Sequence, residues 1–87
     1  MRTRILYRSN TESEPAVVEF VKSLDRSDRD RVELVDVNSR DGDGLARLYG
    51  IQKYPSVIVT AVDGTLVRSW FGGLPLVSDF TYYLHQN

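Results

Sequence analysis

The side chains that could do chemistry in this 87-residue chain are few, and cysteine is not among them. Without a thiol the chain can form no disulfide, no thiolate metal site and no redox-active cysteine pair. The only histidine, His85, falls near the end of the chain, where we expect a frayed tail, so no Ser–His arrangement can be assembled around it. The sequence therefore predicts no catalytic residue, no metal site and no cofactor.

Residues 36–44 superficially resemble a calcium-binding loop, because they are rich in Asp, Asn and Gly. The spacing does not fit. Gly42 comes one position late, Arg40 stands at a ligand position, and Arg47 replaces the bidentate glutamate. We interpret this run as a turn that leads into a helix.

Composition limits the classes of partner. The formal net charge is −1, and no stretch concentrates Lys and Arg, so we expect no nucleic-acid partner. No apolar run is long enough to cross a membrane, and no signal-peptide pattern follows Met1. We therefore expect no membrane partner and a cytoplasmic location. The length predicts a single domain over residues 1–87.

The first half of the chain shows two strand-then-helix patterns. A short apolar run at residues 5–7 predicts a buried strand. Thr11 and Glu14 fit a capping box that opens a helix over about residues 12–25. The charged run 25–31 is typical of an exposed helix end and loop.

The second strand is predicted at residues 32–37, where apolar and polar residues alternate. A loop at 38–44 should lead to a short helix that presents three apolar side chains on one face, namely Leu45, Leu48 and Tyr49. Gly50 stands where a left-handed residue ends a helix, and Ile51 stands where the accompanying apolar contact is expected.

The remainder predicts a hairpin and a closing helix. Strand-like residues 56–62 and 65–71 flank Asp63-Gly64, a strong signal for a two-residue hairpin turn. Gly72-Gly73 interrupts the pattern. An apolar stripe then predicts an amphipathic C-terminal helix that packs on the sheet, and its members are Leu76, Val77, Phe80, Tyr83 and Leu84.

The predicted order is β-α-β-α-β-β-α, with the first two strands parallel and the last two antiparallel. This order, together with residues 45–51, 54–59, Asp63-Gly64 and Gly72-Gly73, resembles the thioredoxin-like superfamily over nearly the whole chain. The short first strand looks more like the compact glutaredoxin-type core than full thioredoxin. The resemblance implies an α/β fold with a four-stranded mixed sheet flanked by three helices, and a cis peptide bond at Pro55.

The chain departs from the redox members of that superfamily where their cysteine motif belongs. The segment between the first strand and the first helix reads Ser9-Asn10-Thr11-Glu12-Ser13-Glu14. Serine and threonine hydroxyls are not appreciably ionised near neutral pH and cannot carry electrons, so thiol–disulfide chemistry is excluded. Glu12 and Glu14 suit the positive end of a helix rather than a nucleophile.

A second interpretation is a glutathione-binding or glutathione-dependent enzyme. Glutathione transferases carry a Tyr or Ser at the end of the first strand, and Tyr7 and Ser9 occupy comparable places. Tyr7 also fits a role as a core or sheet residue. The second, helical domain of the transferases is absent from this sequence.

The leading hypothesis is a cysteine-less, non-redox module that binds an unidentified protein or peptide. The resemblance implies that Tyr54, the residue before the proline, offers its backbone to an extended peptide, although Pro55 could also serve only to shape the start of the third strand. The expected groove is lined by Asn10, Thr11, Glu12, Tyr54, Pro55, Gly72 and Gly73. Trp70 or Phe71, if it faced outward, would extend an aromatic contact patch there. A structural or assembly subunit is the third hypothesis.

Overall fold

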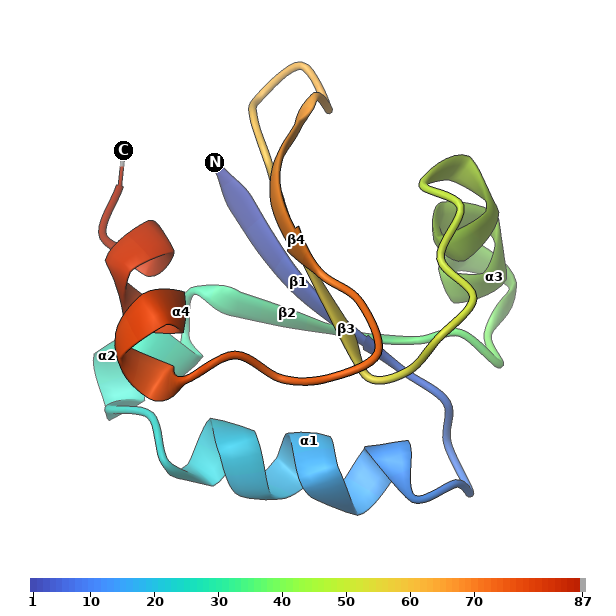
Figure 1. Ribbon diagram of the computed structural model, residues 1–87, viewed down its shortest axis with the longest axis horizontal. Helices are drawn as coiled ribbons and strands as arrows, with labels where there is room; N and C mark the ends of the chain where they lie inside the picture. Colours follow the sequence, from blue (N-terminus) through green and yellow to red (C-terminus); the bar gives the residue numbers. More distant parts are fainter. Residues whose placement is uncertain (87) are drawn as a thin grey trace.

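A computed structural model describes residues 1–86, and the last residue of the expected domain, Asn87, lies outside the described part. Figure 1 shows a mixed sheet with helices on both of its faces. The elements in chain order are β1 (Arg2–Tyr7), α1 (Ser13–Lys22), α2 (Arg26–Arg29), β2 (Val32–Asp36), α3 (Arg40–Leu48), β3 (Ser56–Thr60), β4 (Leu66–Trp70) and α4 (Val77–Leu84). The predicted α/β architecture is confirmed, but the predicted number of helices, three, was wrong, because α2 forms inside the run expected to be an exposed helix end and loop.

The four strands lie in the order β2-β1-β3-β4. β1 runs parallel to β2 and antiparallel to β3, and β3 runs antiparallel to β4. The two central strands are the most buried, since all five residues of β3 and the four residues Thr3 to Leu6 of β1 are shielded from solvent. This explains why the apolar residues of each strand, 5–7 in β1 and 57–59 in β3, form a short continuous run rather than an alternating pattern.

Each face of the sheet carries its own apolar cluster. On one face α1 and α4 cover a cluster centred on Ile5, Val57 and Phe80, in which the ring of Phe80 meets that of Phe20 edge to face with centroids 5.0 Å apart. On the other face α3 covers a cluster centred on Leu6 and Ile58. Figure 1 shows α3 on the side of the sheet away from α1 and α4.

Helix α1 is shorter than expected, beginning at Ser13 and ending at Lys22. The predicted capping box does not form, because Glu12 is the N-cap residue and no side chain caps the helix. The Thr11 hydroxyl accepts a bond from the Ser13 N–H at 3.3 Å, but no bond returns from the Glu14 side chain within residues 1–86. The Thr11 hydroxyl instead donates to the Arg8 carbonyl oxygen at 2.6 Å, which curls the loop back on itself.

Helix α3 begins at Arg40, so the loop predicted over 38–44 was wrong. The reason is Ser39, whose hydroxyl accepts the Gly42 N–H at 3.0 Å and caps the helix five residues before the expected apolar face. The expected face is correct for Leu45 and Tyr49, which pack against the cluster under α3, but Leu48 is 74% exposed, and the small residues Gly42 and Ala46 are buried instead.

The C-terminus of α3 agrees with the prediction. Gly50 has φ +66°, its N–H donates to the Arg47 carbonyl oxygen, and the Ile51 N–H donates to the Ala46 carbonyl oxygen at 2.8 Å. These two bonds define a Schellman motif, and Ile51 is buried as the motif requires.

The hairpin between β3 and β4 has a longer turn than the predicted two residues. The Ala61 N–H donates to the Thr65 carbonyl oxygen at 2.8 Å, and the Gly64 N–H donates to the Ala61 carbonyl oxygen. Gly64 has φ +90°. The loop is therefore three residues with glycine in the left-handed position, a turn that Asp-Gly serves equally well. The strands are shorter than predicted, and the register shifts where Val67 forms a bulge.

Two expectations about the end of the chain also change. Leu76 precedes α4 and is 71% exposed, so it is not part of the buried stripe. His85 is not in a frayed tail, because its Nε2 atom lies 2.9 Å from a carboxylate oxygen of the buried Asp28. This contact ties the end of α4 to α2. Among residues 1–86, no helix combines the length and apolar character that a membrane span requires.

Candidate functional site

The sequence predicts that three segments of the chain line one groove, and side-chain contacts connect these segments in the structure. The Arg8 guanidinium, in the loop after β1, lies 5.3 Å from the centroid of the Tyr54 ring. The Ser56 hydroxyl, next to Pro55, accepts the Gly72 N–H at 3.1 Å. The Tyr54–Pro55 peptide bond, between these two links, is cis. The structure thus connects the β1–α1 loop, the start of β3 and the segment after β4.

The β1–α1 loop presents its polar side chains outward. Asn10, with φ +62°, and its neighbours Thr11 and Glu12 are exposed. Ser13 is buried beneath them, where its hydroxyl accepts the Arg8 N–H at 3.1 Å. The loop therefore has a fixed hydrogen-bonded base and an exposed rim.

A carboxylate that the sequence prediction missed holds the base of this loop. Asp36, at the end of β2, accepts the Asn38 N–H at 3.0 Å and the Ser9 N–H at 3.1 Å. The Asn38 side chain then donates to the Ser9 carbonyl oxygen and accepts from Arg8 at 2.8 Å. Bonds from Asn38 and Ser9, followed by the nearby Arg8 charge, hold the pKa of Asp36 below its ordinary value.

The pKa of Asp36 leads to a pH prediction. A carboxyl whose pKa is lower in the folded than in the unfolded chain gives stability that is complete above the unfolded value, about 3.9, and is lost as pH falls through the folded value. Asp36→Asn is therefore expected to be less stable than the original chain at pH 7 and to show a shallower loss of stability toward pH 3. Urea unfolding between pH 7 and pH 3 measures both the stability at neutral pH and its loss as the pH falls. Parallel pH profiles for the two proteins would contradict the prediction.

Tyr7 and Ser9, the residues considered for glutathione, have different surroundings. The Tyr7 side chain packs against the apolar cluster under α1 and α4, and burial, followed by the negative charges of Asp36 and Glu14, raises the pKa of its hydroxyl. The Ser9 hydroxyl accepts a bond from the Asn38 amide at 2.9 Å.

The glycine pair after β4 is joined to the residue that follows Pro55 by the bond between Gly72 and Ser56. Gly72 has φ +77°, and a side chain there would begin 3.2 Å from a carbon of Lys53, whose stem lies against it. Gly73 meets no atom within 4 Å in the direction of a side chain, so this position is open. Gly72 is thus a place where the chain needs glycine, and Gly73 leaves free space.

An apolar hollow of about 280 Å³ adjoins this segment and is lined by Gly50, Gln52, Lys53 and Phe71. Phe71 is 51% exposed, whereas Trp70 is half-buried, with its ring 5.6 Å from that of Tyr83. Phe71 is therefore the outward-facing aromatic that the sequence left undecided.

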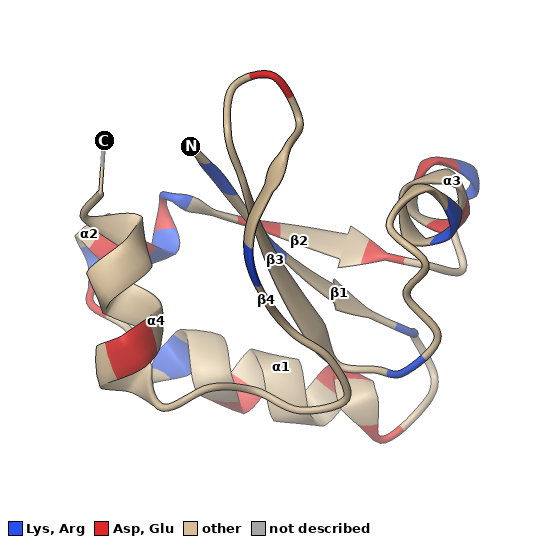
Figure 2. Ribbon diagram, turned by 45° about the horizontal axis from the view of Figure 1, so that its top comes forward, with Lys and Arg blue, Asp and Glu red and all other residues tan. Residues whose placement is uncertain are grey.

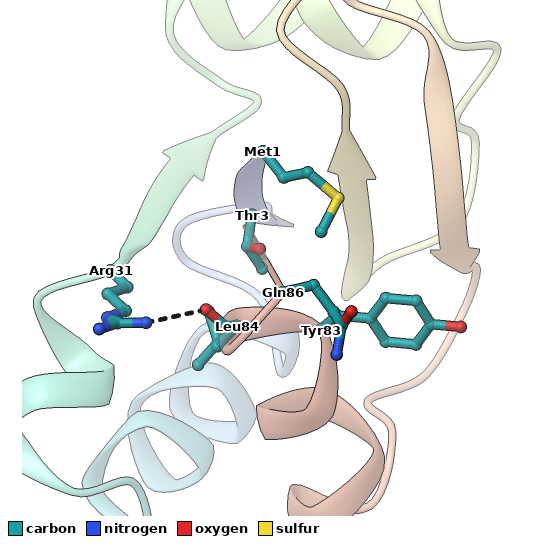
Figure 3. Close-up of a pocket in the computed structure, with 6 residues that line it drawn as sticks. All are labelled: Met1, Thr3, Arg31, Tyr83, Leu84 and Gln86. Carbon is teal, nitrogen blue, oxygen red and sulfur yellow. Dashed lines mark hydrogen bonds between the residues drawn. The ribbon is translucent and has the colours of Figure 1, made fainter.

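A separate hollow of about 250 Å³ lies at the other end of β1, beside Thr3 rather than Tyr7 (Figure 3). Its lining residues are Met1, Thr3, Arg31, Tyr83, Leu84 and Gln86. Arg31 donates to the Leu84 carbonyl oxygen at 3.0 Å and so satisfies the end of α4. This cation stabilises a helix terminus and belongs to the scaffold rather than to the candidate groove.

The sequence prediction missed three side chains at the candidate groove: Arg8, Asp36 and Asn38. Arg8 is the first residue after β1, Asp36 is the last residue of β2, and Asn38 lies two residues further on, and strand ends of this kind favour site residues in α/β folds. The described residues place hydroxyls, amides, carboxylates and a guanidinium around Pro55. This set can bind by hydrogen bonds and by apolar contact, but it cannot exchange electrons.

No protein-family model and no curated protein matches the sequence. Among solved structures, the fold is similar to the crystal structure of the Neisseria meningitidis DsbD C-terminal domain in the reduced form. The TM-score is 0.66 at 19% sequence identity, over 94% of this chain and 76% of that one. The chain therefore has a thioredoxin-like fold, and it has that fold without any cysteine.

Proposed function

We propose that this protein is a non-redox module that binds an extended peptide segment along the groove beside Pro55. The observation that carries the proposal is the unpaired backbone of Tyr54. Within residues 1–86, neither its N–H nor its carbonyl oxygen takes part in a hydrogen bond, although the side-chain hydroxyl donates to the Ile51 carbonyl oxygen. An extended peptide that pairs with Tyr54 would satisfy both groups.

The side chains around Tyr54 would supply selectivity, which backbone pairing alone lacks. Arg8 lies against one side of the Tyr54 ring, and the Phe71 hollow lies on the side of Lys53. Backbone pairing gives affinity that is independent of sequence, whereas a hollow that accepts one side chain gives selectivity. We therefore expect the preferred peptides to carry an apolar residue that packs on Phe71.

The test begins with a phage-displayed library of linear heptapeptides, selected against the whole chain. Titration calorimetry then measures the affinity of an enriched peptide for Tyr54→Ala and Phe71→Ala. We expect each substitution to weaken binding about tenfold, equivalent to about 1.4 kcal/mol. Leu48→Ala, an equally apolar change at a highly exposed position on α3, is the matched control and should leave affinity unchanged.

Two results would overturn the proposal. One is a library that enriches no peptide above background. The other is a bound peptide that leaves the Tyr54 amide unmoved, because alanine at position 54 would keep the backbone groups that pair. In a ¹⁵N-labelled sample, the Tyr54 amide should move on adding the peptide. Reduced glutathione at millimolar concentration, the alternative ligand, is expected to leave that amide unmoved.

A further inference from the structure

The Phe71 hollow beside the proposed groove contains a single charged side chain. Its lining residues are Gly50, Gln52, Lys53 and Phe71. Residues 48–62 include Lys53 and no other charged residue, and residues 69–78 include none. Figure 2 shows Lys53 as the one blue band on the segment that joins α3 to β3. The charge of the hollow is therefore that of one ammonium group.

This ammonium group has no charged partner in the described part of the chain. Within residues 1–86, no carboxylate forms an ion pair with Lys53, and its side chain makes no hydrogen bond. The other lysine, Lys22, lies 3.8 Å from a carboxylate oxygen of Glu19. Lys53 is thus available to an anion from another molecule.

The acidic residues of the groove belong to other segments. Glu12 lies in the β1–α1 loop, and Glu14 lies in the first turn of α1. Asp36 ends β2, where its carboxylate already accepts two backbone N–H groups. The groove therefore carries carboxylates on the segments next to α1 and a cation on the segment before Pro55.

The stem of Lys53 is packed in place. A Cβ atom built at Gly72 would lie 3.2 Å from the Lys53 Cδ atom and 3.3 Å from its Cβ atom, so the stem lies against the glycine. The Ser56 hydroxyl donates to the Lys53 carbonyl oxygen and accepts the Gly72 N–H, which joins the two backbones. A side chain whose stem is already packed loses less conformational entropy when its charged end binds a partner.

The hollow combines this cation with an exposed aromatic ring, since Phe71 is 51% exposed. In an extended peptide, successive side chains point to opposite sides, and side chains two positions apart lie on the same side, about 7 Å apart. Phe71 and Lys53 line the same hollow, so one side of a peptide can meet both. An apolar side chain suits the ring, and a carboxylate two positions away suits the ammonium group.

We infer that the peptide bound beside Pro55 carries an Asp or Glu two positions from the apolar residue that packs on Phe71, and that this carboxylate pairs with the Lys53 ammonium group. The inference rests on the proposed function, because it concerns the same groove and names the partner more closely. An exposed ion pair changes affinity about threefold. Lys53 therefore selects among peptides that backbone pairing alone would bind alike.

Selection of the heptapeptide library against the original chain and against Lys53→Met tests the inference. Methionine keeps an unbranched stem against Gly72 and removes the charge. With the original chain, we expect Asp or Glu to be enriched two positions from an apolar residue. Lys53→Met should lose this preference, and Lys53→Arg, which keeps the charge, should retain it.

Titration calorimetry then compares an enriched peptide with the same peptide in which the acidic residue is replaced by its amide. The original chain should bind the acidic form about threefold more tightly, and about 0.5 M NaCl should reduce this difference. Lys53→Met should bind the two forms equally. Lys22→Met, the same change on α1, is the matched control and should still prefer the acidic form.

Equal affinity of the original chain for the two forms of a peptide that moves the Tyr54 amide would overturn this inference and leave the proposed function in place. Equal loss of the preference in Lys22→Met and Lys53→Met would also overturn it. A library that enriches no peptide would overturn both. Urea unfolding checks that Lys53→Met folds, and the two peptide forms test the inference on the original chain in any case.

Discussion

Replacing Gly42 by alanine is expected to lower the free energy of unfolding by about 3 kcal/mol. Gly42 lies in the first turn of α3 at its closest approach to the end of β2. A Cβ atom built there would lie 2.1 Å from the Asp36 carbonyl oxygen and 2.7 Å from its carbon. Both atoms belong to the backbone, so no side chain can rotate away, and the helix or the strand end must move.

The matched control is two residues further along the same helix. Gly44 faces solvent, and a Cβ atom there would meet nothing within 4 Å. Because alanine favours a helix interior more than glycine does, Gly44→Ala should raise stability by about 0.5–1 kcal/mol. Urea unfolding of both variants tests whether the two substitutions change the free energy of unfolding in opposite directions. Equal destabilisation, or a neutral Gly42→Ala, would contradict the close packing of α3 on the end of β2.

Gly42 also illustrates why part of the fold could not be predicted from the sequence. The helix pattern around it was sought in large apolar residues, which led to the expectation that Leu48 faces the core. Leu45 and Tyr49 do pack on the core, but the buried residues of the helix are the small ones, Gly42 and Ala46, and Leu48 is left exposed. The spacing of large apolar residues does not reveal a helix face on which small residues let the helix backbone come close to the strand backbone.

Features determined by local chemistry were predicted correctly. The Gly50–Ile51 end of α3 follows from the left-handed conformation that glycine allows, and the same property of Gly64 turns the hairpin. The number of residues in that hairpin was wrong, because Asp-Gly serves both two-residue and three-residue loops. Helix α2 was missed because four residues without apolar spacing carry no periodic signal.

The candidate groove was predictable only where it depends on the family pattern. Residues before and after Pro55 could be named from the sequence, and so could the loop between the first strand and the first helix. Asp36 and Asn38 could not, because their bonds to Ser9 span more than 25 positions and arise from the parallel pairing of β1 with β2. The sequence pattern predicts which segments of the chain lie together, but the side-chain hydrogen bonds between those segments depend on the folded geometry.

Ser56→Ala is expected to cost about 1–3 kcal/mol of folding stability. Ser56 is fully buried at the start of β3, where its hydroxyl donates to the Lys53 carbonyl oxygen and accepts the Gly72 N–H at 3.1 Å. Alanine would leave the Gly72 N–H without this acceptor and would release the segment after β4 from the start of β3. Urea unfolding measures the first effect, and amide hydrogen exchange at Gly72 measures the second.

Ser27→Ala is the control for this prediction, because Ser27 lies exposed on α2 and its hydroxyl makes no hydrogen bond within residues 1–86. Its stability should change by less than about 0.5 kcal/mol. If Ser56→Ala were as mild, or if exchange at Gly72 did not quicken, the hydroxyl would not hold the two segments together. The expected pair of results would instead show that one buried serine fixes the spacing between Lys53 and Gly72. Lys53 and Phe71, which line the proposed hollow, lie next to the two segments that Ser56 joins, so we expect Ser56→Ala to alter peptide selectivity as well as stability.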